Sequence, residues 1–316
     1  MNNCNNKEVD LVYLWVDGND PTWQEKRNAC IGKPKDESGV NCAGRYANHD
    51  ELKFSLRSIE KYAPWIHKIF IVTDHQVPAW LDLSHPKIKI IDHQDIMPKD
   101  CLPCFNSALI EHFIYRIPNL AEHFIYANDD MLINRPVTPE SFFAKDGLPI
   151  VRLNRRPFRR WTLLFKEKVL KKPLSNYNIT IRNSAELVYK KYGIYFNGKT
   201  HHNIDAYLKS TYQYTNEIFK NEIAATYSNH VRSANDIQRN IYSYVALAEK
   251  RAHLKYVNQR TSFRLHIDNE GNYRKLEKYN PLLFCMNDSE FAHDCDREKA
   301  AAFLEKRFPQ KSQFEK

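Results

Sequence analysis

Short apolar runs alternate with amphipathic segments along the first half of the chain. Residues 11–16, 69–73, 88–91 and 124–127 are continuous, apolar and rich in β-branched and aromatic side chains, which predicts four buried strands. Residues 50–62 and 107–117 place apolar side chains at helical spacing, and a proline follows each run. Asn48 and Glu51 predict a capping pair for the first helix. This alternation predicts an α/β, Rossmann-like fold with a largely parallel sheet flanked by helices.

The remainder of the chain has a different pattern. Residues 151–199 are rich in basic and aromatic side chains, and we expect a basic surface insertion there. Its arginines favour either a groove for a polyanion or a solvated loop; they are Arg152, Arg155, Arg156, Arg159 and Arg160. From residue 200 the pattern is mainly helical, with helices expected from near His202, from about 235 to 250 and from about 297 to 307. We therefore expect one domain, made of an α/β half (1–150), the insertion (151–199) and a helical part (200–316).

Each predicted strand runs into an aspartate. These residues are Asp17, Asp74, Asp92 and Asp129. Because ligands of open α/β sheets bind at the carboxyl ends of the strands, we expect the four acids along one edge. An aspartate there is also a common helix N-cap, and for Asp74 and Asp92 the two interpretations are equally good. Asn128, Asp129 and Asp130 favour a bound Mg²⁺ or Mn²⁺ ion, since these ions prefer carboxylate and phosphate oxygens.

Composition limits the classes of function. The 316 residues are 42% hydrophobic and 27% charged, as in globular proteins. No apolar run approaches the roughly 20 residues of a membrane span, and residues 1–7 lack a secretory core, so a cytoplasmic location is expected. The net charge of +9 indicates an anionic partner. No glycine-rich phosphate loop is present, and the seven cysteines, including the Cys101–Cys104 pair, are expected to be reduced thiols.

Several strings are unusual enough to indicate a family. In the first half they are VDLVYLWVDGNDPTW (9–23), DELKFSLRSIEKYAPW (50–65), IFIVTDHQVPAW (69–80), LPCFNSALIE (102–111) and FIYANDD (124–130). Later come HNID (202–205), HVRSANDIQ (230–238), CMND (285–288) and FPQKSQFE (308–315). In this order they resemble the four conserved blocks of the Stealth family. That family includes bacterial capsular and exopolysaccharide phosphotransferases and the lysosomal-targeting N-acetylglucosamine-1-phosphotransferase.

The resemblance implies an enzyme with a GT-A-like fold. It would transfer a sugar-1-phosphate from a nucleotide-diphospho-sugar, first of all a UDP-sugar, to a hydroxyl of a capsular or exopolysaccharide acceptor. A phosphodiester forms and a nucleoside monophosphate leaves; metal-dependent glycosyl transfer with a glycosidic product is the alternative. A basic protein can also contact the inner membrane or capsule-assembly proteins peripherally. No nucleic-acid-binding motif is present, and no nucleic-acid partner is expected.

The same resemblance implies roles for individual residues. Asp129 and Asp130 are expected to hold the metal ion, and Asp130 is also expected to be catalytic. His202 is the expected general base, because an imidazole takes up protons near neutral pH. Glu111 is expected to act as a metal ligand or acid-base group, and Arg232 to clamp the transferred phosphate. The expected substrate-binding residues are Asp17, Gly18, Asn19, Asn106, Ser107, Asn128, Asn287 and Asp288.

Overall fold

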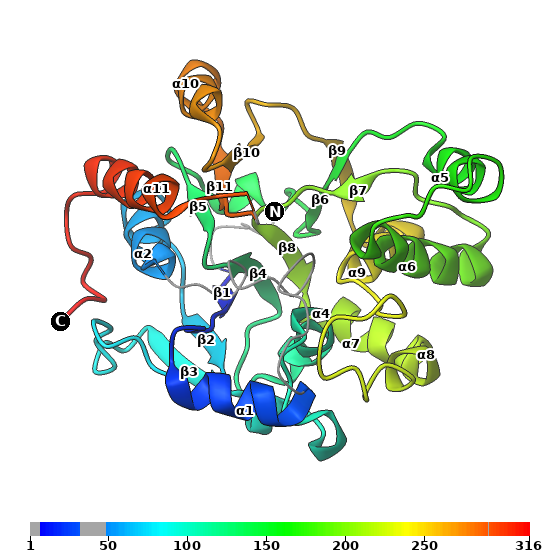
Figure 1. The fold of residues 1–316 in the computed structure, drawn as a ribbon, viewed down its shortest axis with the longest axis horizontal. Coiled ribbons are helices and arrows are strands. Elements are labelled where there is room, and N and C mark those ends of the chain that lie inside the picture. The colour runs from blue at the N-terminus through cyan, green and yellow to red at the C-terminus, as the bar shows by residue number, and fades with distance from the viewer. Residues whose placement is uncertain (1–6, 32–48, 290) are drawn as a thin grey trace.

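A five-stranded sheet lies at the centre of the computed structural model, which describes residues 7–31, 49–289 and 291–316 (Figure 1). The strand order is β3-β2-β1-β4-β8. The strands are β1 (Val9–Leu14), β2 (Ile69–Thr73), β3 (Ile88–Asp92), β4 (His123–Asn128) and β8 (Asp205–Leu208). The pairings of β3 with β2, β2 with β1, and β1 with β4 are parallel, whereas β8 runs antiparallel to β4. The predicted α/β fold with a largely parallel sheet is confirmed.

Two three-stranded sheets join the last third of the chain to the first half. One has the order β10 (Ser262–His266), β11 (Leu283–Asn287), β5 (Met131–Ile133). The other has the order β7 (Lys199–Thr200), β6 (Ile150–Asn154), β9 (His253–Tyr256). Since β5 pairs with β11 and β6 with β9, segments more than a hundred residues apart lie side by side. The first of these pairings brings the turn after β4 next to β11.

Helices cover both faces of the central sheet because successive strand side chains point to opposite sides. Leu11 and Tyr13 of β1 pack with Leu56 of α2, while Val12 packs on the other face with the cluster that contains α4, α7 and α9. The helices are α1 (Pro21–Ile31), α2 (Glu51–Tyr62), α3 (His93–Ile96), α4 (Ser107–Ile110), α5 (Arg159–Lys168), α6 (Asn176–Tyr192), α7 (Lys209–Ile218), α8 (Lys220–Ala224), α9 (Asn240–Ala248), α10 (Glu270–Tyr279) and α11 (Asp294–Arg307). The 3₁₀ segments are η4 (Lys99–Cys101), η5 (Glu111–Arg116) and η6 (Pro139–Ser141).

Three local expectations need correction. The helix expected from near His202 is wrong over its first part: residues 205–208 form β8, buried on both faces, and α7 begins at Lys209. The helix expected at 107–117 is a single α-turn followed by η5. The basic insertion is not a loop, because it folds into β6, α5, α6 and β7.

The expected cap of α2 takes another form. Asn48 lies outside the described residues, and Asp50, in a left-handed conformation with φ of 63°, precedes the helix. Glu51 nevertheless reaches back and accepts a hydrogen bond from the His49 backbone N–H at 2.8 Å. The first turn is therefore closed by the predicted glutamate.

A buried ion pair holds the C-terminal segment against α2. Arg57 donates from Nε and Nη2 to the two carboxylate oxygens of Glu315, each at 2.8 Å. Its Nη1 donates to the Phe308 carbonyl at 2.8 Å. Both side chains are almost fully buried, so residues 308–315 are fixed to the helix that covers the central sheet.

The five cysteines in the described ranges are free thiols, of which Cys101, Cys104 and Cys285 are buried and Cys30 and Cys295 exposed. Cys4 and Cys42 lie outside those ranges. Across the part of the chain that the structure describes, no helix has both the length and the apolar character needed to cross a membrane.

Candidate active site

The four strand-end aspartates lie along the carboxyl edge of the central sheet, but two of them are occupied locally. Asp92 caps α3, accepting from the Gln94 backbone N–H at 3.0 Å, and also pairs with His75. The helix-cap interpretation therefore holds for Asp92. Asp74 pairs with Lys26 of α1 at 2.5 Å, and it lines a cleft at this edge.

The cleft consists of two adjoining pockets. The first, here called the aromatic pocket, encloses about 750 Å³ counted to its open mouth, and Trp15, Trp23 and Phe105 form much of its wall. The second, here called the polar pocket, encloses about 860 Å³ and is lined by residues such as Tyr177 and Thr180. Ser107, Asn128 and Arg232 line both pockets and form the junction between them.

The junction residues are held by defined contacts. Arg232 Nη2 donates to Ser107 Oγ at 3.0 Å. The Asn128 side-chain oxygen accepts from the Tyr126 hydroxyl at 2.9 Å. Asp129 follows Asn128 and lines the aromatic side of the junction. A guanidinium and a carboxylate thus stand where the two pockets meet.

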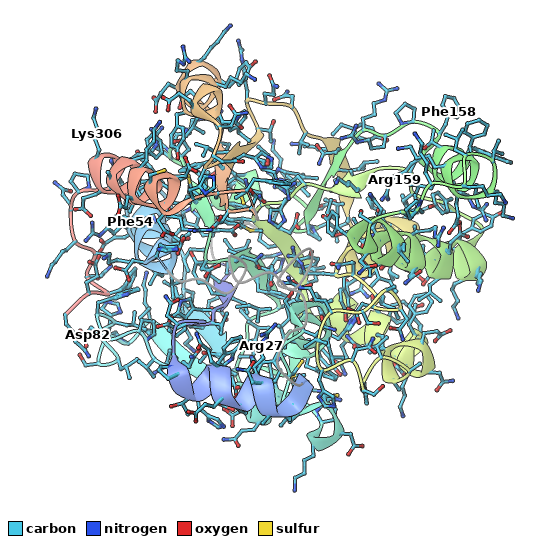
Figure 2. All side chains as sticks on the ribbon, in the orientation of Figure 1. Arg27, Phe54, Asp82, Phe158, Arg159 and Lys306 are labelled. Carbon is cyan, nitrogen blue, oxygen red and sulfur yellow. The ribbon has the colours of Figure 1, made fainter. Side chains whose placement is uncertain are left out.

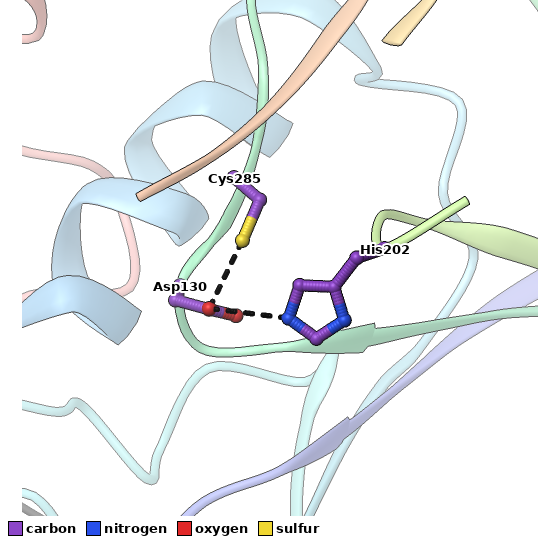
Figure 3. A group of neighbouring side chains, drawn as sticks. All are labelled: Asp130, His202 and Cys285. Carbon is purple, nitrogen blue, oxygen red and sulfur yellow. Dashed lines mark hydrogen bonds and ion pairs between the residues drawn. The ribbon is translucent and has the colours of Figure 1, made fainter. Parts of the chain in front are cut away.

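Asp130 lies in the turn between β4 and β5, next to residues from two other parts of the chain (Figure 3). Its Oδ2 accepts from the Cys285 thiol of β11 at 3.0 Å, and His202 Nε2 lies 3.8 Å from the same oxygen. Burial favours a higher pKa for Asp130, but His202 and the Cys285 hydrogen bond outweigh it and hold the pKa below its ordinary value. His202 and Asp130, 72 positions apart in the sequence, therefore belong to one site.

The carboxylates around this turn suit a hard divalent cation. Burial, with Asp130 and Glu51 nearby, raises the pKa of Asp129 well above its ordinary value. Burial, with smaller contributions from Asp130 and Asp288, raises the pKa of Glu51 to about 7. Asp130 Oδ1 is buried without a hydrogen-bond partner among the described residues. Crowded buried carboxylates call for protons or a cation, and their oxygens are the ligands that Mg²⁺ and Mn²⁺ prefer.

The neighbouring thiol belongs to a group of possible metal ligands. Asp130, His202 and Cys285 each offer one ligand atom, and these atoms lie within 4.8 Å of one another. Burial, followed by the charge of Asp130, raises the pKa of Cys285 well above its ordinary value. Metals bind the thiolate rather than the thiol. A metal bound at this group would have to displace the thiol proton; with that proton in place, Cys285 donates a hydrogen bond to Asp130. The assignment of Mg²⁺ or Mn²⁺ to Asp129 and Asp130 stays a prediction.

Glu111 takes part in a buried network that begins beside the junction. It accepts from the Tyr126 hydroxyl at 2.8 Å and lies 3.7 Å from Arg239 Nε. Arg239 is stacked over the Tyr126 ring at 3.9 Å, and its Nη2 lies 3.4 Å from Asp205. Burial raises the pKa of Glu111, and Arg239 opposes that rise. Glu111 lines the polar pocket and reaches the junction through Tyr126 and Asn128, with no direct contact to the Asp129–Asp130 pair.

Sequence analysis missed Arg239 and Tyr126. Arg239 follows directly after the string 230–238, so its neighbourhood was marked, but nothing in a linear pattern pairs residue 239 with residue 111. Tyr126 alternates with core residues in β4 and resembles any buried strand tyrosine. The roles of Arg239 and Tyr126 could be recognised only from the tertiary structure.

The two adjacent histidines have different surroundings. His201 is buried, with Nδ1 2.9 Å from Ser262 Oγ and Nε2 3.0 Å from Asp205. The half-buried His202 lines the polar pocket and faces Asp130. Both histidines line the polar pocket, but the side chain of His201 is 2% exposed and that of His202 is 31% exposed, so His202 is the more accessible to a molecule in the cleft.

The expected substrate-binding residues divide into two groups. Ser107 and Asn128 line the cleft. The others lie outside the lining of both pockets, namely Asp17, Gly18, Asn19, Asn106, Asn287 and Asp288.

Local hydrogen bonds account for several of these positions. The Asp17 carboxylate accepts a hydrogen bond from the Asn19 backbone N–H at 3.0 Å, which holds both residues in a turn. Trp15 and Val16, which precede this turn, line the aromatic pocket instead of Asp17, Gly18 and Asn19. Asn106 is fully buried; it caps α4 and donates to Asp236 at 3.0 Å. Asp288 pairs with Arg297 at 2.9 Å.

Comparisons with known proteins match the first two of the four expected blocks, in the expected order. Conserved region 1 of Stealth proteins matches residues 7–34, and conserved region 2 matches residues 45–151. The capsular polysaccharide phosphotransferase of Haemophilus influenzae is 33% identical over 308 residues, covering 90% of this chain and 79% of that protein. The capsular polysaccharide phosphotransferase of Neisseria meningitidis serogroup B is 31% identical over 314 residues, covering 94% of this chain and 81% of that protein.

Other relatives are longer than this chain. An exopolysaccharide phosphotransferase of Streptomyces coelicolor is 34% identical over 98% of this chain, which spans 52% of that protein. The chain also spans 41% of an exopolysaccharide phosphotransferase of Lactiplantibacillus plantarum. Among solved structures, a galactosyltransferase in complex with donor and acceptor sugar analogs has a TM-score of 0.45 and 13% identity, with 96% of both chains covered. That likeness is too slight to carry an argument about function.

Proposed function

The chain belongs to the Stealth protein family, and we propose that it transfers a sugar-1-phosphate from a nucleotide-diphospho-sugar to a hydroxyl of a growing capsular or exopolysaccharide. The acceptor oxygen forms a bond to the phosphorus nearest the donor sugar. The bond between that phosphorus and the bridging oxygen breaks, and a nucleoside monophosphate leaves. The acceptor hydroxyl gives up its proton, and the product is a phosphodiester.

The observation that carries this proposal is the two-part cleft. Flat aromatic walls suit a nucleobase, so the aromatic pocket is assigned to the nucleoside of the donor. The polar pocket offers many hydrogen-bonding groups and is assigned to the acceptor sugar. A diphosphate that leads from the first pocket towards the second would pass Arg232 and Asp129 at the junction. The bond to be broken then lies between donor and acceptor.

Residues at and near the junction have separate tasks in this proposal. Arg232 binds the transferred phosphate, because a guanidinium matches two phosphate oxygens at once. His202, in the wall of the polar pocket, takes the proton of the acceptor hydroxyl. Glu111 and Tyr126 orient Asn128 at the edge of the acceptor pocket. Such positioning, combined with charge neutralisation, is the main requirement of phosphoryl transfer.

A divalent ion is the proposed cofactor. Asp129 and Asp130 would hold Mg²⁺ or Mn²⁺, and the bound ion would supply positive charge to offset that of the donor diphosphate. A UDP-sugar is the first donor to test. Peripheral contact with capsule-assembly proteins is compatible with the basic charge of the chain.

Phosphorus NMR tests the reaction directly. The protein is incubated with a panel of nucleotide-sugars, Mg²⁺ or Mn²⁺ and oligosaccharide acceptors. A phosphodiester resonance that appears together with a nucleoside monophosphate is the expected result. Release of a nucleoside diphosphate, with no phosphodiester, would establish glycosyl transfer instead and overturn the proposal.

A further inference from the structure

A protruding arm of the protein carries a row of exposed apolar side chains. This arm, residues 155–172, contains α5 and lies at the edge of the molecule, far from α2 and α11 (Figures 1 and 2). The exposed fractions are 71% for Phe158, 71% for Trp161, 53% for Phe165, 62% for Val169 and 46% for Leu170. Four of these positions are spaced by three or four residues, so they form one stripe along a helix.

The opposite side of α5 already has partners within the chain. Leu163 is buried, and Arg159, also buried, donates to Asn178 of α6. The helix therefore has one face against the protein and an apolar face in solvent. Monomeric soluble proteins rarely leave such a contiguous apolar patch uncovered, and one usually marks a binding surface.

Basic side chains surround this apolar stripe. Six exposed ones belong to the arm, namely Arg155, Arg156, Lys166, Lys168, Lys171 and Lys172. The arm contains a single acidic residue, Glu167, and Arg182 of α6 pairs with it at 2.7 Å. The surface around Trp161 and Phe165 is thus strongly positive.

We propose that this arm docks on an anionic lipid surface. Trp161, Phe165 and Val169 enter the headgroup region, and the surrounding lysines and arginines bind lipid phosphates. An amphipathic helix with aromatic residues on one face and basic residues beside it is the pattern of an interfacial membrane anchor. A polyanionic polysaccharide would bind the charges and stack on Trp161, but the exposed aliphatic side chains of Val169 and Leu170 offer it little. An acidic protein surface would bind without regard to lipid composition.

Docking would also orient the cleft. The arm continues through residues 173–175 into α6, whose first residues Asn176 and Tyr177 line the polar pocket. A bilayer bound to the arm is therefore connected to the wall of this pocket through only three residues of chain. The proposal goes beyond the reaction and stands independently of it.

Vesicle co-sedimentation tests the proposal. The full chain is mixed with vesicles of phosphatidylcholine alone or of phosphatidylcholine with phosphatidylglycerol. Binding is expected to the anionic vesicles, to weaken with added salt, and to fall about tenfold or more in a Trp161→Ser, Phe165→Ser double variant. Leu83→Ser is the matched control, because Leu83 is 51% exposed and lies elsewhere, on the connection between β2 and β3.

Two further measurements separate docking from other causes. Vesicle binding should shift tryptophan fluorescence to the blue in the wild type, and much less in Trp161→Phe, which keeps the apolar face. Sedimentation velocity without lipid should give the same oligomeric state for the wild type and the double variant. The proposal is overturned if the protein binds both vesicle types equally or binds neither. It is also overturned if the wild type forms an oligomer that the double variant disrupts, because the arm would then be an interface between copies of the chain.

Discussion

Arg232 donates a hydrogen bond to Ser107 Oγ at 3.0 Å, and these two side chains separate the aromatic pocket from the polar pocket. If Arg232 binds the transferred phosphate, Arg232→Lys keeps the charge but loses the planar pair of donors. We expect kcat to fall about 100-fold, comparable to the loss of one transition-state donor. Ser107→Ala, which removes one hydrogen-bond acceptor of Arg232, should cost far less. Phosphorus NMR rates measure both, and wild-type turnover by Arg232→Lys would contradict the assignment.

Removal of the divalent ion should stop the reaction. Asp129→Asn and Asp130→Asn should each lower kcat about 1,000-fold, since the donor diphosphate loses its counter-charge. The matched control is Asp92→Asn at the same sheet edge, where the side chain caps α3. Because asparagine caps a helix about as well as aspartate, that variant should lose little stability and keep its activity. Chelation with EDTA and restoration with Mg²⁺ or Mn²⁺ complete the test; unchanged rates in EDTA would exclude the ion.

The two pockets should respond separately to substitution. Trp23→Ala removes an aromatic wall that packs edge-to-face on Phe105 at 5.3 Å, and it should raise KM for the donor. Tyr177→Ala, in the polar pocket, should raise KM for the acceptor instead. About tenfold is expected in each case, the effect of one lost contact of 1–2 kcal/mol. Initial rates with one substrate varied at a time give both constants, and the assignment of the pockets fails if the two variants behave alike.

Buried thiols should resist alkylation. Burial raises the pKa of Cys101 to about 11, that of Cys104 to about 12, and that of Cys285 well above its ordinary value. Because the thiolate is the reactive form, iodoacetamide at neutral pH should leave these three unmodified until the protein is denatured. The exposed Cys30 and Cys295 provide the internal control and should react in the native state. Peptide mapping by mass spectrometry distinguishes the five sites.

The pair of Arg57 and Glu315 should contribute stability that depends on pH. Burial favours a raised pKa for Glu315, but Arg57 and Ser312 outweigh it and hold the pKa below its usual 4.5. A depressed carboxyl pKa stabilises the fold above about pH 4.5, and the contribution disappears as pH falls through the folded-state value. Glu315→Gln should therefore cost about 3 kcal/mol at pH 7 and less in acid.

Glu305 supplies the control for that measurement. It also lies near Arg57, at 3.3 Å, but its side chain is largely exposed. Glu305→Gln should change the free energy of unfolding by less than about 1 kcal/mol. Thermal unfolding at neutral and acid pH compares the two variants. An equal effect of both substitutions would show that the Arg57–Glu315 pair owes no extra stabilisation of the fold to its burial.

Much of the central sheet could be predicted from local pattern. The runs that became β1, β2, β3 and β4 are short, apolar and bounded by polar residues, so strand length and burial agree. Residues 205–208 could not be assigned in this way, because a wholly buried run has no clear period and the helical residues of α7 follow at once. Pairing with β4, a tertiary contact, makes it a strand.

The candidate site was predictable in part for a similar reason. Asp129 and Asp130 stand at a strand end, so their position follows from sheet geometry. The proximity of His202 was implied by family resemblance alone, because a residue 72 positions away has no local signal. Asn287 and Asp288 were expected in the cleft for the same reason, yet β11 places them outside its lining. The Arg239 network depends on four separate segments and has no sequence pattern.

The narrow junction of the cleft has a kinetic consequence. Three side chains are shared between two pockets whose other lining residues differ, so one substrate does not have to leave before the other enters. On the proposed reaction, donor and acceptor would then be bound at the same time, and no enzyme-bound phosphoryl group would be required. Double-reciprocal plots should therefore intersect, as in a sequential mechanism, and should not run parallel as in a ping-pong exchange.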